Sequence, residues 1–199
     1  MKNILYVIGL YSGLCGHPFI STASADILFE SGTLGPTGTA EGAIPSTNVS
    51  AGVYPGVRFQ LTQPVKTEQI GGHFVDDLGG TFFGAIVKLE DATDFPDSAD
   101  LSTPDVLGAT QLTFPVLSAE VFGDLSLSLN PGWYALVFGT GRFGTSGSGG
   151  ALRNNPDIGD PAYIGLHLGD GWFNFADLSD VLDFSNHRFV INGVPEPSS

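Results

Sequence analysis

Basic residues are scarce in this chain of 199 residues, which contains 7 Lys and Arg against 21 Asp and Glu. The formal net charge is −14, so the surface lacks the clustered cations that bind nucleic-acid phosphates or anionic lipids, and we expect no nucleic-acid partner. Cysteine is scarcer still. Cys15 is the only one, which excludes a disulfide scaffold and a cysteine-ligated zinc or iron–sulfur site.

Long apolar runs and helical periodicity are also missing. Beyond residue 25 no segment is apolar over the roughly 18 residues that a membrane helix needs, so we expect no stable membrane span. No window of about twelve residues shows an apolar stripe at helical spacing. The best helical segment is short, Asp177 to Phe184, and little helix is expected.

The dominant pattern is an alternation of apolar and polar residues with a period of two. Val57, Phe59 and Leu61, for example, alternate with Arg58 and Gln60. Such alternation is typical of half-buried antiparallel strands. It recurs in the segments 82–89, 121–129, 133–138, 163–168 and 188–191.

Glycine and proline separate these segments. The chain has 28 Gly and 13 Pro, and pairs such as Gly71-Gly72, Gly79-Gly80 and Pro131-Gly132 are typical of turns. About ten short strands joined by turns predict an all-β fold, an antiparallel two-sheet β-sandwich that is jelly-roll-like. Hydrophobic residues make up 42% and include 15 Phe, enough to form its core.

One turn predicts a specific contact. The pair Pro131-Gly132 leads into a strand that carries Tyr134 near its start. In sandwich folds a tyrosine at such a position buries its ring and bonds its hydroxyl to a nearby backbone group. We predict this role for Tyr134.

Residues 1–25 have the features of a secretory signal peptide. Lys2 supplies the positive start, residues 4–14 form a short apolar stretch, and Ala23 and Ala25 occupy a small-x-small cleavage site. Cleavage after Ala25 would remove the one cysteine. The alternatives are a buried first strand or helix, and a lipoprotein attached through Cys15, which the large Leu14 before it disfavours.

The C-terminal sequence Val194-Pro195-Glu196-Pro197-Ser198 resembles the start of a PEP-CTERM sorting signal. The body is similar to the β-sandwich domains of such exported bacterial proteins. The similar stretches are 58–59, 70–74, 83–87, 131–139, the Gly-rich loop to residue 150, and 188–190.

This resemblance implies a Gram-negative source and export to the cell surface or the medium. It also implies association with extracellular polysaccharide or biofilm matrix, and an exosortase-type enzyme as a processing partner. The expected domains are a signal peptide over 1–25, a β-sandwich over 26–193 and a remnant of the sorting motif over 194–199. In the family an anchor helix and a basic tail follow the motif, whereas this sequence stops at Ser199. Either it is truncated or this member is released.

Asp91, Asp94 and Asp97 recur at every third position of a Pro-containing segment. Calcium prefers carboxylate and carbonyl oxygens, so these residues are the candidate ligands of a calcium ion. The order of ligands in an EF-hand is absent, and the alternative is a solvated acidic face. Calcium is the one cofactor that we consider.

Two other patterns point away from bound groups. The glycines of residues 139–144 match the spacing of a dinucleotide-binding fingerprint, but the Gly- and Ser-rich residues 145–150 follow where that site needs a helix. The mature histidines, His73, His167 and His187, are scattered and have no metal-ligand spacing. We expect neither a nucleotide nor a transition metal.

Trp133, Trp172 and Asn174 form the candidate carbohydrate platform. If Tyr134 and Phe173 point into the core, the alternation of a strand turns these three side chains outward. Sugar rings stack their apolar faces on aromatic side chains, and amides bind their hydroxyls. The alternative is that both tryptophans complete the core or cover loops.

No local pattern singles out catalytic residues, so we expect a non-catalytic protein. The resemblance to PEP-CTERM proteins implies that it belongs to the extracellular matrix. The second hypothesis is a carbohydrate-binding module, with or without calcium. The third is a glycoside hydrolase, which needs two facing carboxylates that a sequence rich in acids cannot identify.

Overall fold

The computed structural model describes residues 25–178 and 185–196. Almost all regular structure in this part is antiparallel strand, which confirms the all-β prediction. The described helical structure is a 3-10 turn, η1 (Phe175–Leu178), at the start of the segment predicted to be helical; residues 179–184 of that segment lie outside the described residues. The strands are β1 (Asp26–Glu30), β2 (Ser46–Val49), β3 (Val53–Leu61), β4 (Val65–Leu89), β5 (Val106–Thr113), β6 (Ala119–Asp124), β7 (Ser128–Leu129), β8 (Gly132–Gly139), β9 (Gly147–Leu152), β10 (Ala162–His167), β11 (Gly171–Asn174) and β12 (Phe189–Pro195).

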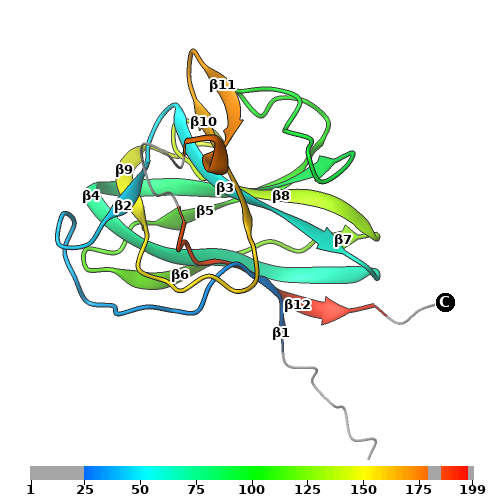
Figure 1. Cartoon of the computed structure of the whole chain (residues 1–199), viewed down its shortest axis with the longest axis horizontal. Helices are drawn as coiled ribbons and strands as arrows, with labels where there is room; N and C mark the ends of the chain where they lie inside the picture. The colour runs from blue at the N-terminus through cyan, green and yellow to red at the C-terminus, as the bar shows by residue number, and fades with distance from the viewer. Residues whose placement is uncertain (1–24, 179–184, 197–199) are drawn as a thin grey trace, which may run out of the picture.

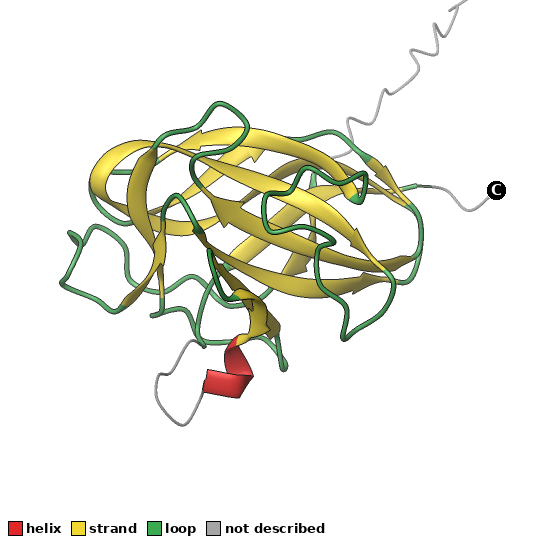
Figure 2. Cartoon of the chain, turned by 90° about the horizontal axis from the view of Figure 1, so that it is seen from above, coloured by secondary structure: helices red, strands yellow, loops and turns green. Residues whose placement is uncertain are grey.

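The long strand β4 belongs to both layers of the sandwich (Figure 1). Its first half pairs with β12 and β9 on one side and with β6 and β7 on the other, and this first sheet also includes β1 and β2. Its second half pairs with β5 and β8, and this second sheet continues through β3, β10 and β11. The strand turns back at Gly79 and Gly80, whose φ angles of 73° and 93° favour glycine. The sheet therefore curls over on itself, as Figure 2 shows from above.

The pair Gly71-Gly72 does not form the turn that the sequence suggests. Both residues lie inside β4, between β6 and β12. A Cβ atom on Gly71 would lie 2.0 Å from the carbonyl oxygen of Val121, and one on Gly72 would lie 2.3 Å from that of Arg188. Glycine is needed here because neighbouring strands approach closely, not because the chain reverses.

The main core lies between the two sheets and is rich in phenylalanine. Phe74 of the first sheet contacts Phe82 and Phe138 of the second, with ring centroids 4.7 and 4.9 Å apart. These side chains are fully buried. Burying one such ring contributes roughly 2–3 kcal/mol, so this aromatic cluster is a major source of stability.

Tyr134 takes the predicted position at the edge of this core. Its ring is 2% exposed and stacks on Phe59 with centroids 5.6 Å apart. Its hydroxyl donates a 2.7 Å hydrogen bond to the carbonyl of Asn130, in the turn before β8. The prediction of a buried ring with a satisfied hydroxyl is confirmed.

The second sheet is covered on its outer face as well, by residues 90–105, which we call the outer loop. Phe95, Ala99 and Leu101 of this loop pack in a second hydrophobic cluster, which we call the outer cluster and which includes Phe83 and Val137. The strands in the middle of this sheet are therefore buried on both faces, rather than half-buried as their alternation suggests.

Residues 31–45, which we call the N-terminal loop, are tied to the first sheet and its connections. The Gly38 N–H donates to the Ser118 carbonyl at 2.8 Å, and the Ser118 N–H donates to the Thr39 carbonyl at 2.7 Å. The Gly35 N–H donates to Asn155 Oδ1 at 3.0 Å. Polar side chains of this region, among them His73, are consequently buried.

Candidate functional site

The two tryptophans lie on the outer face of the second sheet but far apart on it. Trp133 on β8 is paired with Gln60 of β3, while Trp172 on β11 reaches β3 through Leu166, which is paired with Tyr54. These two positions on β3 are six residues apart, about 20 Å along an extended strand. The structure therefore does not bring the predicted pair together as one platform.

Trp172 and Asn174 make contacts within the fold. The Trp172 indole packs partly buried on the outer cluster, and its Nε1–H donates to the Ser98 carbonyl at 3.2 Å. Asn174 accepts a 2.7 Å bond from Arg58 and donates to Asp177 at 3.0 Å. These bonds hold the outer loop and the turn η1 against β11.

Arg58 fastens the outer loop to the second sheet. Its guanidinium donates to the carbonyls of Asp94 at 2.6 Å and Thr93 at 3.1 Å, as well as to Asn174. The guanidinium carbon lies 4.3 Å from the centroid of the Phe95 ring. Burial lowers the pKa of Arg58, and the nearby Asp94 carboxylate opposes this shift.

The sequence did not identify Arg58 as the residue that holds the outer loop, because the alternation alone only places it on the polar face of its strand. The only local signal was a lone cation in a strand with few charges. Which loop covers that face depends on tertiary contacts with residues more than thirty positions away.

Asp91, Asp94 and Asp97 organise their own loop. Asp91 Oδ1 accepts bonds from the N–H and hydroxyl of Thr93, both at 2.7 Å, and these bonds lower the pKa of Asp91. The two oxygens of Asp94 accept backbone N–H groups of Glu90 and Phe95. Such bonds are typical of Asx turns.

The described residues contain no group of three or more His, Cys, Asp or Glu side chains arranged to hold a metal ion. The three aspartates of the calcium hypothesis are therefore not gathered around one point in this part of the chain. Calcium binding stays a prediction from sequence, without geometric support from this loop.

Trp133 lines a shallow cavity of about 320 Å³ between the end of β4, the outer loop and the start of β8. The indole is partly buried on the outer cluster, so its body is held in place. Four carboxylates and one ammonium group surround it. The other lining residues are Lys88, Leu89, Glu90, Asp94, Asp97, Asp105 and Gly132.

The charges in this cavity are not neutralised by the lysine. The Lys88 ammonium lies 4.6 Å from the centroid of the Tyr134 ring, and among the described residues it forms no ion pair. Asp105 Oδ2 accepts the Asp97 N–H at 2.9 Å. Its Oδ1 is buried and has no hydrogen-bond partner within the described ranges. The cavity thus combines an aromatic side chain with an excess of carboxylates.

Two larger cavities, of about 540 and 520 Å³, adjoin η1. Arg58, Asp157 and Tyr163 line the first, whereas Tyr54 and Leu166 line the more apolar second. Residues 179–184, which directly follow η1 in the chain, lie outside the described part. We assign no site to either.

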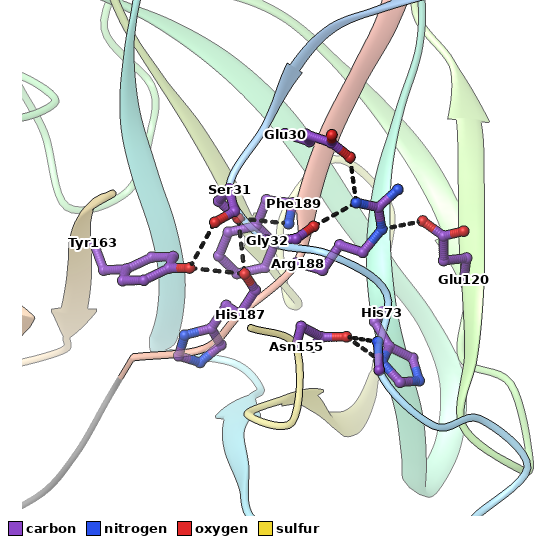
Figure 3. A network of polar contacts seen from close by, with 11 residues as sticks. Glu30, Ser31, Gly32, His73, Glu120, Asn155, Tyr163, His187, Arg188 and Phe189 are labelled. Carbon is purple, nitrogen blue, oxygen red and sulfur yellow. Dashed lines mark hydrogen bonds and ion pairs between the residues drawn. The ribbon is translucent and has the colours of Figure 1, made fainter. Parts of the chain in front are cut away.

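A buried ion pair joins three strands of the first sheet (Figure 3). Arg188, directly before β12, donates to Glu30 of β1 and to Glu120 of β6, both at 2.5 Å, and also to the carbonyl of Gly32. Burial alone would lower the pKa of Arg188, but the hydrogen bonds to the two glutamates outweigh it and raise the pKa.

His73 lies near this ion pair with a fixed tautomer. Asn155 donates from Nδ2 to the carbonyls of Leu152 and Asn186, so its Oδ1 faces the ring and also accepts the Gly35 N–H. His73 Nδ1 lies 2.8 Å from that oxygen and therefore carries the proton.

The other ring nitrogen of His73 is buried and unbonded in the described structure. Burial lowers the pKa of His73 below its ordinary value of 6.5, since the charged ring would lose its hydration. Arg188 adds to this shift, while Asn155 and Glu120 oppose it. The histidine is a neutral structural residue.

His187 and Tyr163 extend the buried polar network shown in Figure 3. His187 Nε2 lies 2.8 Å from the Thr47 hydroxyl, and the His187 carbonyl accepts bonds from Ser31 and Tyr163. The Tyr163 hydroxyl also lies 2.6 Å from a carboxylate oxygen of Asp157. Burial and this carboxylate raise the pKa of Tyr163 well above its ordinary value. The arrangement stabilises the junction of the N-terminal loop with β12.

The described part of the C-terminal motif belongs to the first sheet. Val194 and Pro195 lie in β12, beyond the predicted domain boundary, and are paired with Lys66 and Val65. The Glu196 N–H donates to the Pro64 carbonyl at 3.0 Å, and its carboxylate accepts the Ser128 hydroxyl at 2.9 Å. Pro197 lies outside the described residues.

The predicted cleavage site adjoins the first strand. Ala25 is exposed and immediately precedes β1, while Ala23 lies outside the described residues. The Gly-rich residues 139–144 are followed by β9, and not by the helix that a dinucleotide-binding fingerprint needs at this position. Within the described ranges, no helix is both long and apolar enough to cross a membrane.

Comparison of the chain with protein families and with curated proteins finds no match.

Proposed function

We propose that this chain is an exported, non-catalytic β-sandwich protein of the extracellular matrix of a Gram-negative bacterium. The observation that carries the proposal is the pairing of β1 with β12 at the edge of the first sheet (Figure 1), in which Asp26 is opposite Gly193. It brings the junction with the predicted leader beside the predicted sorting motif. A domain with both ends at one edge can be held there while its remaining surface faces the matrix.

The contacts of the motif support this reading. Val194 and Pro195 are fixed by β4, and Glu196 is bonded to Pro64 and Ser128. An exosortase-type enzyme would therefore act on the residues that follow Glu196, without unfolding the sandwich. The proposed sequence of events is removal of the leader, folding, and processing or release at the tail.

The packing also suits an exported protein that loses its one cysteine with the leader. Its two sheets enclose a core of phenylalanine rings, and two loops cover the outer faces. The acidic surface keeps such a domain soluble at high local concentration. Stability then depends on packing and hydrogen bonds rather than on covalent links.

Export can be tested in a Gram-negative host that expresses the complete gene. Mass spectrometry of the extracellular protein should find an N-terminus at Asp26. Replacing Ala23 and Ala25 with phenylalanine should block cleavage, whereas Ser24→Phe is the matched control because the middle position tolerates large residues. An uncleaved chain that stays in the cytoplasm would contradict the proposal.

A second candidate, a carbohydrate-binding module, is favoured by the cavity beside Trp133. An indole among carboxylates offers an apolar face for a sugar ring and acceptors for its hydroxyl groups. The test is cosedimentation of the purified chain with insoluble polysaccharides of neutral, anionic and cationic character. Binding to none of them would remove this candidate and leave a purely structural role.

A further inference from the structure

We propose that the cavity beside Trp133 binds a cationic amino sugar, such as an unacetylated glucosamine unit of a polysaccharide. The inference rests on the carbohydrate-binding candidate and specifies its site and its ligand class. It is carried by an aromatic side chain and an excess of carboxylates that meet in one cavity.

Trp133 forms the aromatic wall of the cavity. Trp133 is anchored on the outer cluster, so its position is fixed before any ligand arrives. The cavity of about 320 Å³ lies at the small end of the range for ligand sites, which suits one or two sugar rings rather than a large cofactor. A sugar ring stacked on the indole also places an attached ammonium group near its face, where a cation is attracted.

The cavity carries an excess of negative charge. Glu90 and Asp97 are exposed at the rim, and Asp94 and Asp105 lie deeper. The nearest cation, Lys88, is directed over the Tyr134 ring. Uronic acids and sulfated or phosphorylated sugars would be repelled, whereas a protonated amine would be attracted.

Hydrogen bonds from backbone N–H groups fix two of the carboxylates in the cavity. Asp105 Oδ2 accepts the Asp97 N–H, and both oxygens of Asp94 accept backbone N–H groups, so these carboxylates are held in place. Asp105 Oδ1 is left buried without a donor in the described part of the chain. That oxygen is closed to solvent, so a ligand ammonium group would bond the exposed carboxylates of Glu90 and Asp97 instead. Neutral hexoses offer only hydroxyl groups, so an amine is the better match to this excess of negative charge.

The experiment is calorimetric titration of the full chain with a glucosamine hexamer, an N-acetylglucosamine hexamer and hexalysine. We expect binding of the glucosamine hexamer that weakens with salt, and much weaker binding of the acetylated hexamer. Trp133→Ala and the double variant Glu90→Gln/Asp97→Asn should each weaken binding by about tenfold or more. The double variant preserves side-chain shape, so it tests the site even if Trp133→Ala loosens the fold.

The matched control is Glu68→Gln/Asp160→Asn, which removes two exposed carboxylates elsewhere and should bind as the parent does. Equal binding of both sugar hexamers would overturn the ligand class but keep carbohydrate binding. Parent-like affinity in the two cavity variants would overturn the site. Hexalysine bound as tightly as the glucosamine hexamer would show unspecific charge attraction and overturn the inference, and a chain that binds no sugar would remove the carbohydrate candidate itself.

Discussion

The hydroxyl of Tyr134 donates a hydrogen bond to the carbonyl of Asn130, four residues earlier in the chain, at 2.7 Å. The bond fastens the turn before β8 to a ring that is stacked in the core. It is the one side-chain contact that local sequence alone located, and its contribution to stability can be measured directly.

Tyr134→Phe should lower the free energy of unfolding by about 1 kcal/mol, the usual net contribution of one hydrogen bond. Urea unfolding followed by tryptophan fluorescence measures the change. Tyr54→Phe is the matched control, because Tyr54 is equally buried and its hydroxyl has no protein partner in the described structure. Equal stability of the parent and Tyr134→Phe would contradict the role of the bond.

Arg58→Lys should release the outer loop. A lysine cannot bond the carbonyls of Thr93 and Asp94 together with Asn174, so partly buried acceptors lose their donors. We expect a loss of about 2–3 kcal/mol and faster proteolysis within residues 90–105. Arg142→Lys, at an exposed position, is the control. A protease-resistant loop in Arg58→Lys would show that apolar packing alone holds it.

His73 should make the protein sensitive to acid. Its pKa is lowered in the folded state, so below about pH 6.5 the unfolded chain binds a proton more readily than the folded one. This part of the stability is complete above pH 6.5 and is lost as the pH falls through the lowered pKa.

The measurement is the free energy of unfolding of the parent and of His73→Gln between pH 7.5 and about 5. The parent should lose stability on acidification more steeply than the variant, which has no ring to protonate. His167→Gln changes an exposed histidine and controls for the substitution itself. Parallel curves for the parent and His73→Gln would exclude the effect.

Arg188→Met should destabilise the protein by about 3–5 kcal/mol, because it leaves Glu30 and Glu120 beside a buried site without their cation. Thermal unfolding monitored by circular dichroism measures the change. The exposed Arg142→Met is the control, and the triple variant Arg188→Met/Glu30→Gln/Glu120→Gln should recover part of the loss. A destabilisation no greater than that of the control would show that the ion pair contributes little.

The sequence predicted those features of the fold that local chemistry determines. Alternation identified the strands, and the turn at Pro131-Gly132 located Tyr134, because both depend on neighbouring residues. The covering of the two outer faces was not predictable. The N-terminal loop and the outer loop have no periodicity, and the face that each one covers is set by partners distant in the chain.

The same limit applies to the candidate sites. The alternation of side chains along a strand correctly placed Trp133 and Trp172 on the same face of the sheet. The two residues are nevertheless far apart, because β3 and β10 lie between the strands that carry them. The spacing of Asp91 and Asp94 suggested metal ligands, whereas the carboxylates bond nearby N–H groups of their own loop. Spacing along the chain cannot distinguish these two uses of an aspartate.

The passage of β4 from one layer to the other has a mechanical consequence. The two layers share this strand, because its two halves are paired in different sheets. Hydrogen exchange at Ile70 and at Ile86 should therefore report the same opening event, with one shared free energy. Melting of this protein is then expected as a single concerted step, with no half-molecule that survives alone.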